Sequence, residues 1–249
     1  MKRVKRRTFA GVVCEQEVYT VGDRVNVKTA EPPRPRFRND EERAQHREEI
    51  SRRRHAQLFN ENFTPASLYS TLTFDNDNEV FSVAECKTLR DAYVRRLKRK
   101  YPEAVIFIYY GEGKTTHRFH LHMVTNGIPA EEISRLWPYG EIRRIEHLRE
   151  RVTYNGTDHG PDYTSLANYL FDHWKESYGG HRWKMTRNAR RPDQEPPEEI
   201  KREYTLEKPP RPPKGYILVE ARQTTFGYLY FKYVKKPQGR RRKTEKRTE

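Results

Sequence analysis

The segment His117-Arg-Phe-His-Leu-His-Met-Val124 alternates between polar and apolar residues with a period of two. That period is typical of a half-buried β-strand. His120 and His122 therefore share one face of the predicted strand, and the apolar residues around them share the other. At about 3.3 Å per residue, the two histidines are about 6.6 Å apart at Cα, so both imidazoles can reach one metal ion. The alternative is two polar side chains on the solvated face of a strand.

The composition indicates a polyanionic partner. The 249 residues include 50 Lys+Arg and 35 Asp+Glu, a formal net charge of +15. Nucleic acid is the usual partner of so basic a protein, and 16 Tyr and 11 Phe offer surface for stacking. Cys14 and Cys86 form no CxxC pattern, which argues against a zinc knuckle and a disulfide framework. Because the sequence has no long apolar run, we expect a cytoplasmic protein without a membrane partner.

Changes in composition divide the chain into four parts. Residues 1–64 are predicted to be a basic N-terminal arm, and residues 65–191 a compact core. Residues 192–234 are predicted to be a proline-rich wrap with C-terminal strands that pack on the core, and residues 235–249 a disordered basic tail. The arm includes a charged helix at 40–59 with Arg52-Arg53-Arg54, which is either a solvated face or a phosphate-binding surface.

The core mixes strands and helices. Ser82 and Glu85 form a capping box at the start of one helix, and an acid-rich turn after Pro129 starts another. The predicted strands are 68–74, 104–110, 117–124 and 141–148, and the predicted helices are 82–100, 129–137 and 162–177. The second and third strands form a hairpin. We therefore predict an α+β fold in which helices flank an antiparallel sheet.

The loop Gly111-Glu-Gly-Lys-Thr-Thr116 resembles a phosphate-binding loop but departs from its pattern. Ile108 stands where that pattern requires a glycine, and the loop leads into a strand rather than a helix. We therefore predict no ATP binding. Glu112 in this loop can lie across from the two histidines, where two imidazoles and one carboxylate would leave open positions on a divalent ion. The alternative is an exposed loop glutamate.

His117 is a rival ligand. Its odd offsets from His120 and His122 place it on the opposite strand face, as a turn residue or DNA contact.

Tyr169 is a candidate nucleophile. The apolar face of the predicted helix at 162–177 comprises Leu166, Ala167, Leu170, Phe171 and Trp174, and Tyr163 falls on that face as a core residue. Tyr169 lies off it, on the same side as Asp172 and His173. A phenol needs a base or a metal ion to remove its proton before it attacks phosphorus. A surface tyrosine without a role is the alternative.

These patterns resemble a known family. A Thr-Leu-Thr-Phe strand ending at Phe74, the His-Leu-His strand and the helix with Tyr169 follow the order of the three motifs of HUH endonucleases. The chain is most similar to rolling-circle replication initiators (Rep) of phages, plasmids and integrative elements in Gram-positive bacteria, in the group related to the filamentous-phage replication protein. Residues 58–63, 182–192 and 226–234 are also similar to that group, and the likeness extends over about residues 5–235.

The resemblance implies a ferredoxin- or RRM-like core with the histidines on a central strand. It implies Mg²⁺ or Mn²⁺ on His120, His122 and Glu112, and Tyr169 as the nucleophile that forms a 5′-phosphotyrosine link and frees a 3′-OH. Many relatives carry a lysine three or four residues after the tyrosine. Here those positions hold Asp172 and His173, so either His173 takes over the role or this copy is slower or inactive.

The implied partners are single-stranded or origin DNA and a host helicase and polymerase in the bacterial cytoplasm. The residues expected to contact DNA are Thr71, Thr73, Arg118, Lys175 and Arg187. Two other functions remain open. One is a non-catalytic RRM-like protein that binds single strands, and the other is a related single-tyrosine transposase or relaxase.

Overall fold

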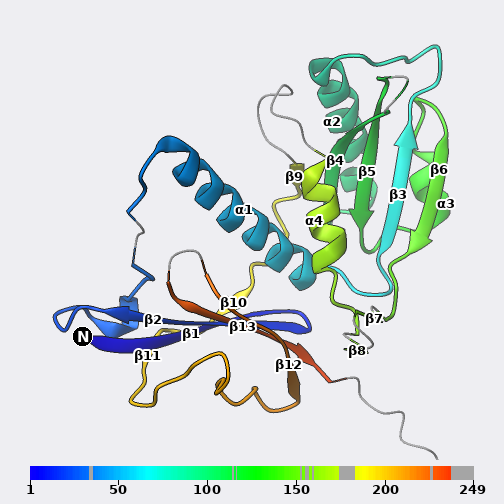
Figure 1. The fold of residues 1–249 in the computed structure, drawn as a ribbon. Helices are drawn as coiled ribbons and strands as arrows, with labels where there is room; N and C mark the ends of the chain where they lie inside the picture. The colour runs from blue at the N-terminus through cyan, green and yellow to red at the C-terminus, as the bar shows by residue number, and fades with distance from the viewer. Residues whose placement is uncertain are drawn as a thin grey trace, which may run out of the picture.

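The computed structural model describes residues 1–33, 36–113, 115, 117–151, 153–154, 157–158, 160–173, 183–224 and 227–236. One of its two large sheets is a five-stranded antiparallel sheet with strand order β6-β3-β5-β4-β9, at the right of Figure 1. The strands are β3 (Leu68–Thr73), β4 (Ile106–Glu112), β5 (Phe119–Thr125), β6 (Ile142–His147) and β9 (Trp183–Met185). Helices α2 (Val83–Lys100) and α3 (Ala130–Arg135) join β3 to β4 and β5 to β6. The resulting β-α-β-β-α-β order is that of the ferredoxin-like motif, which confirms the predicted α+β class.

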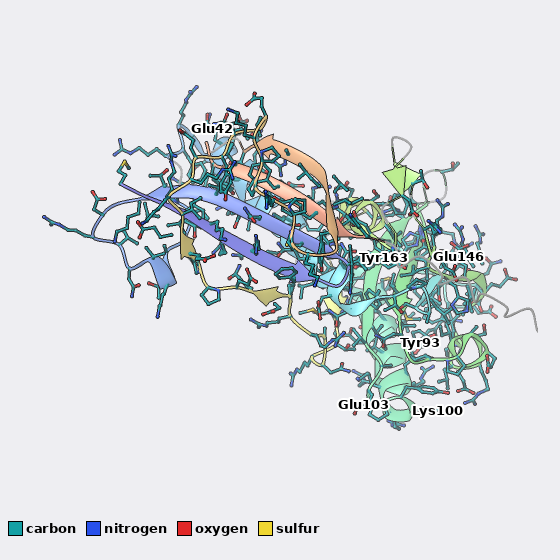
Figure 2. The ribbon with its side chains drawn as sticks, turned by 90° about the horizontal axis from the view of Figure 1, so that it is seen from below. Glu42, Tyr93, Lys100, Glu103, Glu146 and Tyr163 are labelled. Carbon is teal, nitrogen blue, oxygen red and sulfur yellow. The ribbon has the colours of Figure 1, made fainter. Side chains whose placement is uncertain are left out.

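Each face of this sheet has its own core. On one face, here called the α2 face, Leu121 and Met123 of β5 pack with Tyr93 and Leu97 of α2. On the other, called the α4 face, aromatic residues of β4 pack against α1 (Asp40–Asn62) and α4 (Thr164–Asp172). Figure 2 shows Tyr93 and Tyr163, one from each core, at separate places beside the sheet. The predicted alternation along β5 is therefore confirmed, since Leu121 is fully buried in the α2 core.

The helix boundaries follow their capping residues. Ser82 accepts a hydrogen bond from the Glu85 backbone N–H, which confirms it as the N-cap residue, and its hydroxyl donates to the Glu85 carboxylate at 2.8 Å. The predicted helix at 162–177 begins later, because Tyr163 is its N-cap residue. Tyr163 is buried, as predicted, and its hydroxyl donates to the Arg149 carbonyl at 3.0 Å. Trp174 and Lys175 lie outside the described residues.

A second antiparallel sheet has the strand order β10-β1-β2-β13-β12, and β11 also pairs with β1. The strands are β1 (Lys2–Ala10), β2 (Val13–Val21), β10 (Asp193–Gln194), β11 (Glu198–Glu199), β12 (Tyr216–Gln223) and β13 (Leu229–Lys235). A 3-10 turn, η1 (Val27–Thr29), follows β2, and a two-stranded ribbon of β7 (Thr153–Tyr154) and β8 (Thr157–Asp158) precedes α4. Residues 1–21, expected to belong to an arm, are thus a paired hairpin. Of the C-terminal strands, β13 pairs with β2 of that hairpin and β12 pairs with β13, so both belong to this second sheet.

Helix α1 connects the two sheets, as Figure 1 shows. Its second half buries Ala56 and Phe59 in the α4-face core. Arg53 forms ion pairs with Glu15 and Glu17 of β2, and Arg52 forms one with Asp172 at the end of α4. The first two arginines of the predicted basic triplet are therefore used within the protein.

A buried polar network also fixes the second sheet against α4. Lys232 of β13 lies 2.6 Å from the carboxylate of Asp162 and 2.9 Å from the Thr164 hydroxyl. Burial raises the pKa of Asp162. The Lys232 ammonium and the hydrogen bonds that Asp162 accepts from Thr164 outweigh burial and hold this pKa below its ordinary value. Within the described ranges, no helix is long and apolar enough to cross a membrane.

Candidate active site

The two histidines meet on the α4 face of the five-stranded sheet. His120 and His122 lie on β5, which has β3 on one side and β4 on the other. Their Nε2 atoms are 3.1 Å apart, and the two rings are nearly perpendicular, with centroids 4.8 Å apart. At metal–nitrogen distances of about 2.1 Å, two ligands at 90° to each other are about 3.0 Å apart. The pair is therefore already spaced as two adjacent ligands of one ion.

Both imidazoles are neutral at physiological pH. Burial, together with the neighbouring His120 and His173, lowers the pKa of His122 to about 3. Burial also lowers the pKa of His120, and the nearby His173 and Arg143 lower it too. A hydrogen bond with the Arg118 backbone raises this pKa but does not outweigh them. Neutral imidazoles keep the lone pairs that a metal ion requires.

Tyr69 of β3 holds His122 from the side opposite to His120. Its hydroxyl lies 2.7 Å from His122 Nδ1, and the Thr71 hydroxyl lies 3.4 Å from both groups. Burial raises the pKa of Tyr69, so the phenol keeps its proton. Nε2 of His122 is thereby directed at His120, as the outer partners of metal-binding histidines ordinarily direct their ligands.

Gly111 of β4 makes room for His120. The two residues are paired across the β4–β5 ladder. A Cβ atom added at Gly111 would lie 2.2 Å from Nε2 of His120 and 2.7 Å from two ring carbons. Any side chain at residue 111 would therefore move the imidazole away from its position beside His122.

Helix α4 brings Tyr169 and His173 over this pair. Tyr169 is 53 % exposed, in contrast to the buried Ala167, Leu170 and Phe171 of the same helix. The His173 ring lies 4.3 Å from the Tyr169 ring and 4.7 Å from the His122 ring, and Tyr169 and His122 are 6.4 Å apart, all between centroids. His173 Nδ1 is 2.7 Å from the Tyr169 carbonyl, which can only accept. His173 therefore donates its Nδ1–H to that carbonyl, and Nε2 is the ring nitrogen left for another partner.

Asp172 and Glu112, two other predicted site residues, have different neighbours. The Asp172 carboxylate forms a bidentate ion pair with Arg52, at 2.7 and 2.6 Å, and so fixes the end of α4 to α1. Glu112 is paired with Phe119, whose side chain packs in the α2-face core, and its carboxylate lies 2.8 Å from His117 Nδ1. The structure thus brings Glu112 to His117 and not to the histidine pair. His117 precedes β5 and has a φ of 56°.

The side chains around the histidine pair provide part of the ligand set that a divalent metal ion requires. His120 and His122 are neutral and suitably spaced, so these two side chains would hold the ion. However, no group of three or more His, Cys, Asp or Glu side chains in the described part of the chain is arranged to hold a metal. The remaining positions would therefore fall to water and phosphate oxygens, which Mg²⁺ and Mn²⁺ both accept.

The predicted DNA contacts lie at several places. Thr71 borders the histidine pair, and the Thr73 hydroxyl donates to the Glu141 carbonyl at 2.8 Å. Arg118 forms an ion pair with Glu79 at 2.9 Å. Arg187 is exposed beside a hollow of about 370 Å³ near β9, away from the pair. Their roles toward DNA stay predictions.

The sequence does not assign Tyr69 or Gly111 to the site, and it does not indicate that Arg52 pairs with Asp172. The alternation of 68–74 places Tyr69 on one face with Thr71, which was a usable signal. Gly111 stands in the loop that resembles a phosphate-binding loop, and nothing in its sequence indicates the close approach of His120. That loop leads into β5, as predicted, while Lys114 and Thr116 lie outside the described residues.

One comparison with known proteins gave a match, and it covers part of the chain. Residues 67–157 match the model of a family described as replication-associated protein ORF2. The match includes the histidine pair and ends before α4. No curated protein and no solved structure gave a significant match. This part of the chain is therefore similar to replication-associated proteins, which supports a role in initiating replication.

Proposed function

We propose that this protein is a metal-dependent endonuclease of the HUH type, which nicks and rejoins single-stranded origin DNA to start rolling-circle replication. The observation that carries the proposal is the convergence of Tyr169 and His173 on the His120–His122 pair. The match to replication-associated proteins supports the DNA substrate. A host element such as a phage, plasmid or integrative element of Gram-positive bacteria belongs to the same proposal.

The proposed chemistry is supported by the position of Tyr169 and His173 beside the histidine pair. Nε2 of His173 accepts the phenol proton as the Tyr169 oxygen attacks the scissile phosphorus in line. The new bond joins Tyr169 to the 5′-phosphate, and the bond between phosphorus and the 3′-oxygen breaks. The proton held by His173 passes to the departing oxygen, which leaves a 3′-OH for a polymerase to extend. A divalent ion held by His120 and His122 would polarise the phosphate oxygens.

The reverse reaction restores the strand without ATP. The phosphotyrosine bond conserves the energy of the phosphodiester, so attack by a 3′-OH rejoins the DNA and releases Tyr169. Strand separation would then be the work of a host helicase. The exposure of Tyr169 is consistent with a substrate as large as a DNA strand.

The test compares two tyrosines of one helix region. The protein, Tyr169→Phe and Tyr163→Phe are each incubated with single-stranded DNA of the native element and Mn²⁺, and the products are separated on a denaturing gel. Tyr169→Phe should abolish cleavage and adduct, while Tyr163→Phe, which loses one buried hydrogen bond, should retain both. Cleavage should also disappear in excess EDTA and in His122→Ala. Cleavage that persists in Tyr169→Phe or in excess EDTA would contradict the proposal.

A non-catalytic single-strand-binding protein is the second candidate. It is favoured by one observation, namely that the described residues give the histidine pair no third protein ligand. Such a protein would bind DNA equally well with and without a divalent ion and would yield no cleavage in any of these reactions.

A further inference from the structure

The edge strand β6 contains an extra residue beside the histidine pair. Thr71 of β3 is paired with Arg144, whereas the next residue, Leu72, is paired with Ile142. Arg143 is therefore paired with no residue of β3, and β6 has a β-bulge at this position. Bulges of this kind redirect a side chain and recur next to active sites.

The bulge places two arginines on the face of the histidines. Ile142 and Ile145 pack against the α2-face core. Arg144 lies on the other side, with its guanidinium over the Tyr69 ring at 5.8 Å. Arg143 is the extra residue of the bulge, and its charge acts on His120 of the α4 face, which indicates that it also lies toward that face. In a regular strand these positions would alternate, and two successive arginines would not share one face.

The two arginines differ in their partners. Arg144 is engaged, because it stacks on Tyr69 and forms an ion pair with Glu146 at 2.7 Å. Arg143 is exposed and makes no hydrogen bond or ion pair with any residue that the structure describes. Its charge is near enough to the pair to act on His120. Arg143 is thus a free cation on the rim of the site.

Among the residues that the structure describes, the other charged groups at the site are already balanced or neutral. Both imidazoles of the pair are neutral, and Asp172 at the end of α4 is balanced by Arg52. His122, Thr71 and Arg144 are in register across β5, β3 and β6. Because neighbouring strands are about 4.8 Å apart, the β6 backbone is about 10 Å from that of β5. A DNA strand lying over β3 would place a second phosphate near Arg143 while the first is at the histidines.

We propose that Arg143, redirected by the β6 bulge, binds a DNA phosphate one or two nucleotides from the scissile phosphate and so sets the register of the strand over Tyr169. The proposal rests on the function proposed above. It makes Arg143 a substrate-binding residue, and it identifies the β3–β6 side of the sheet as the path of the DNA.

The test uses oligonucleotides in which one phosphate at a time is replaced by an uncharged methylphosphonate. Equilibrium binding is measured without metal for the unmodified protein, Arg143→Gln, Arg143→Lys and Arg99→Gln. Arg99 is an exposed arginine of α2, and its replacement removes the same charge from the opposite face. One methylphosphonate should weaken binding of the unmodified protein about tenfold, as loss of a charge-assisted contact does.

The same methylphosphonate should not weaken DNA binding by Arg143→Gln any further. Arg143→Lys should behave like the unmodified protein. Arg143→Gln should also lower the log–log salt slope by about 0.7, the value for one phosphate on a single strand. Cleavage with Mn²⁺ is measured on the same oligonucleotides. If Arg143→Gln and Arg99→Gln show the same methylphosphonate profile, Arg143 does not bind the phosphate. If the profiles differ while no protein cleaves, Arg143 binds DNA and the nuclease proposal fails.

Discussion

Gly111→Ala should separate the two histidines without unfolding the protein. The new Cβ atom would lie 2.2 Å from His120 Nε2, whereas ordinary contacts begin at 3.4 Å, so the ring must retreat by about 1.2 Å. The backbone at Gly111 has no positive φ, so alanine fits its conformation. Gly→Ala replacements at compatible positions raise stability by about 0.4–1 kcal/mol. A displacement of about 1 Å within a reacting group can cost about 100-fold in rate.

The assay combines a melting curve, titration with Mn²⁺ and the cleavage reaction. Gly111→Ala should melt within a few degrees of the unmodified protein, bind Mn²⁺ more weakly and cleave about 100-fold more slowly. Gly22→Ala is the matched control, because its Cβ atom would meet the nearest atom at 3.9 Å. Unchanged Mn²⁺ affinity and cleavage in Gly111→Ala would refute the view that His120 must stand beside His122.

Three further changes test the surroundings of the site. Tyr69→Phe removes the hydroxyl at His122 Nδ1 and should weaken Mn²⁺ binding by about 10- to 100-fold in calorimetric titration, whereas Tyr93→Phe on the α2 face should not. Burial lowers the pKa of His55 to about 3, so the unfolded chain binds a proton below about pH 6.5 that the folded one does not, and stability falls with acidification. The free energy of unfolding, measured with urea at pH 7 and at pH 5.5, should fall less on acidification in His55→Gln than in the unmodified protein. An equal fall in the two proteins would contradict this cause. Lys232→Met leaves the Asp162 carboxylate buried without its partner and should cost about 3–5 kcal/mol in the same assay, and a loss below about 1 kcal/mol would contradict the role of the pair.

Local patterns in the sequence predicted most of the five-stranded sheet. The alternation of 117–124 gave β5 and its two faces, and Ser82 with Glu85 gave the start of α2, because both signals depend on residues a few positions apart. The wheel of α4 likewise predicted the exposure of Tyr169. That His120 and His122 face α4 was not predictable from the strand alone, since the partner helix is about 40 residues away.

Pairing between distant segments was not predictable in the same way. Strand β2 pairs with β13 more than 200 residues later, and nothing in the basic N-terminus indicates that partner. The position of Glu112 depends on the register of the β4–β5 hairpin, where a shift of one residue moves a side chain to the other face. The loop between these strands does not fix that register by its sequence.

The identity of the nucleophile is the central claim, and mass spectrometry of the covalent adduct tests it most directly. The protein is allowed to react with single-stranded origin DNA and Mn²⁺, the adduct is digested with nuclease and trypsin, and the modified peptide is sequenced. We expect a nucleotide linked through its 5′-phosphate to Tyr169, on a peptide that ends beyond His173. A nucleotide on Tyr163 or on any other residue would contradict the site described here.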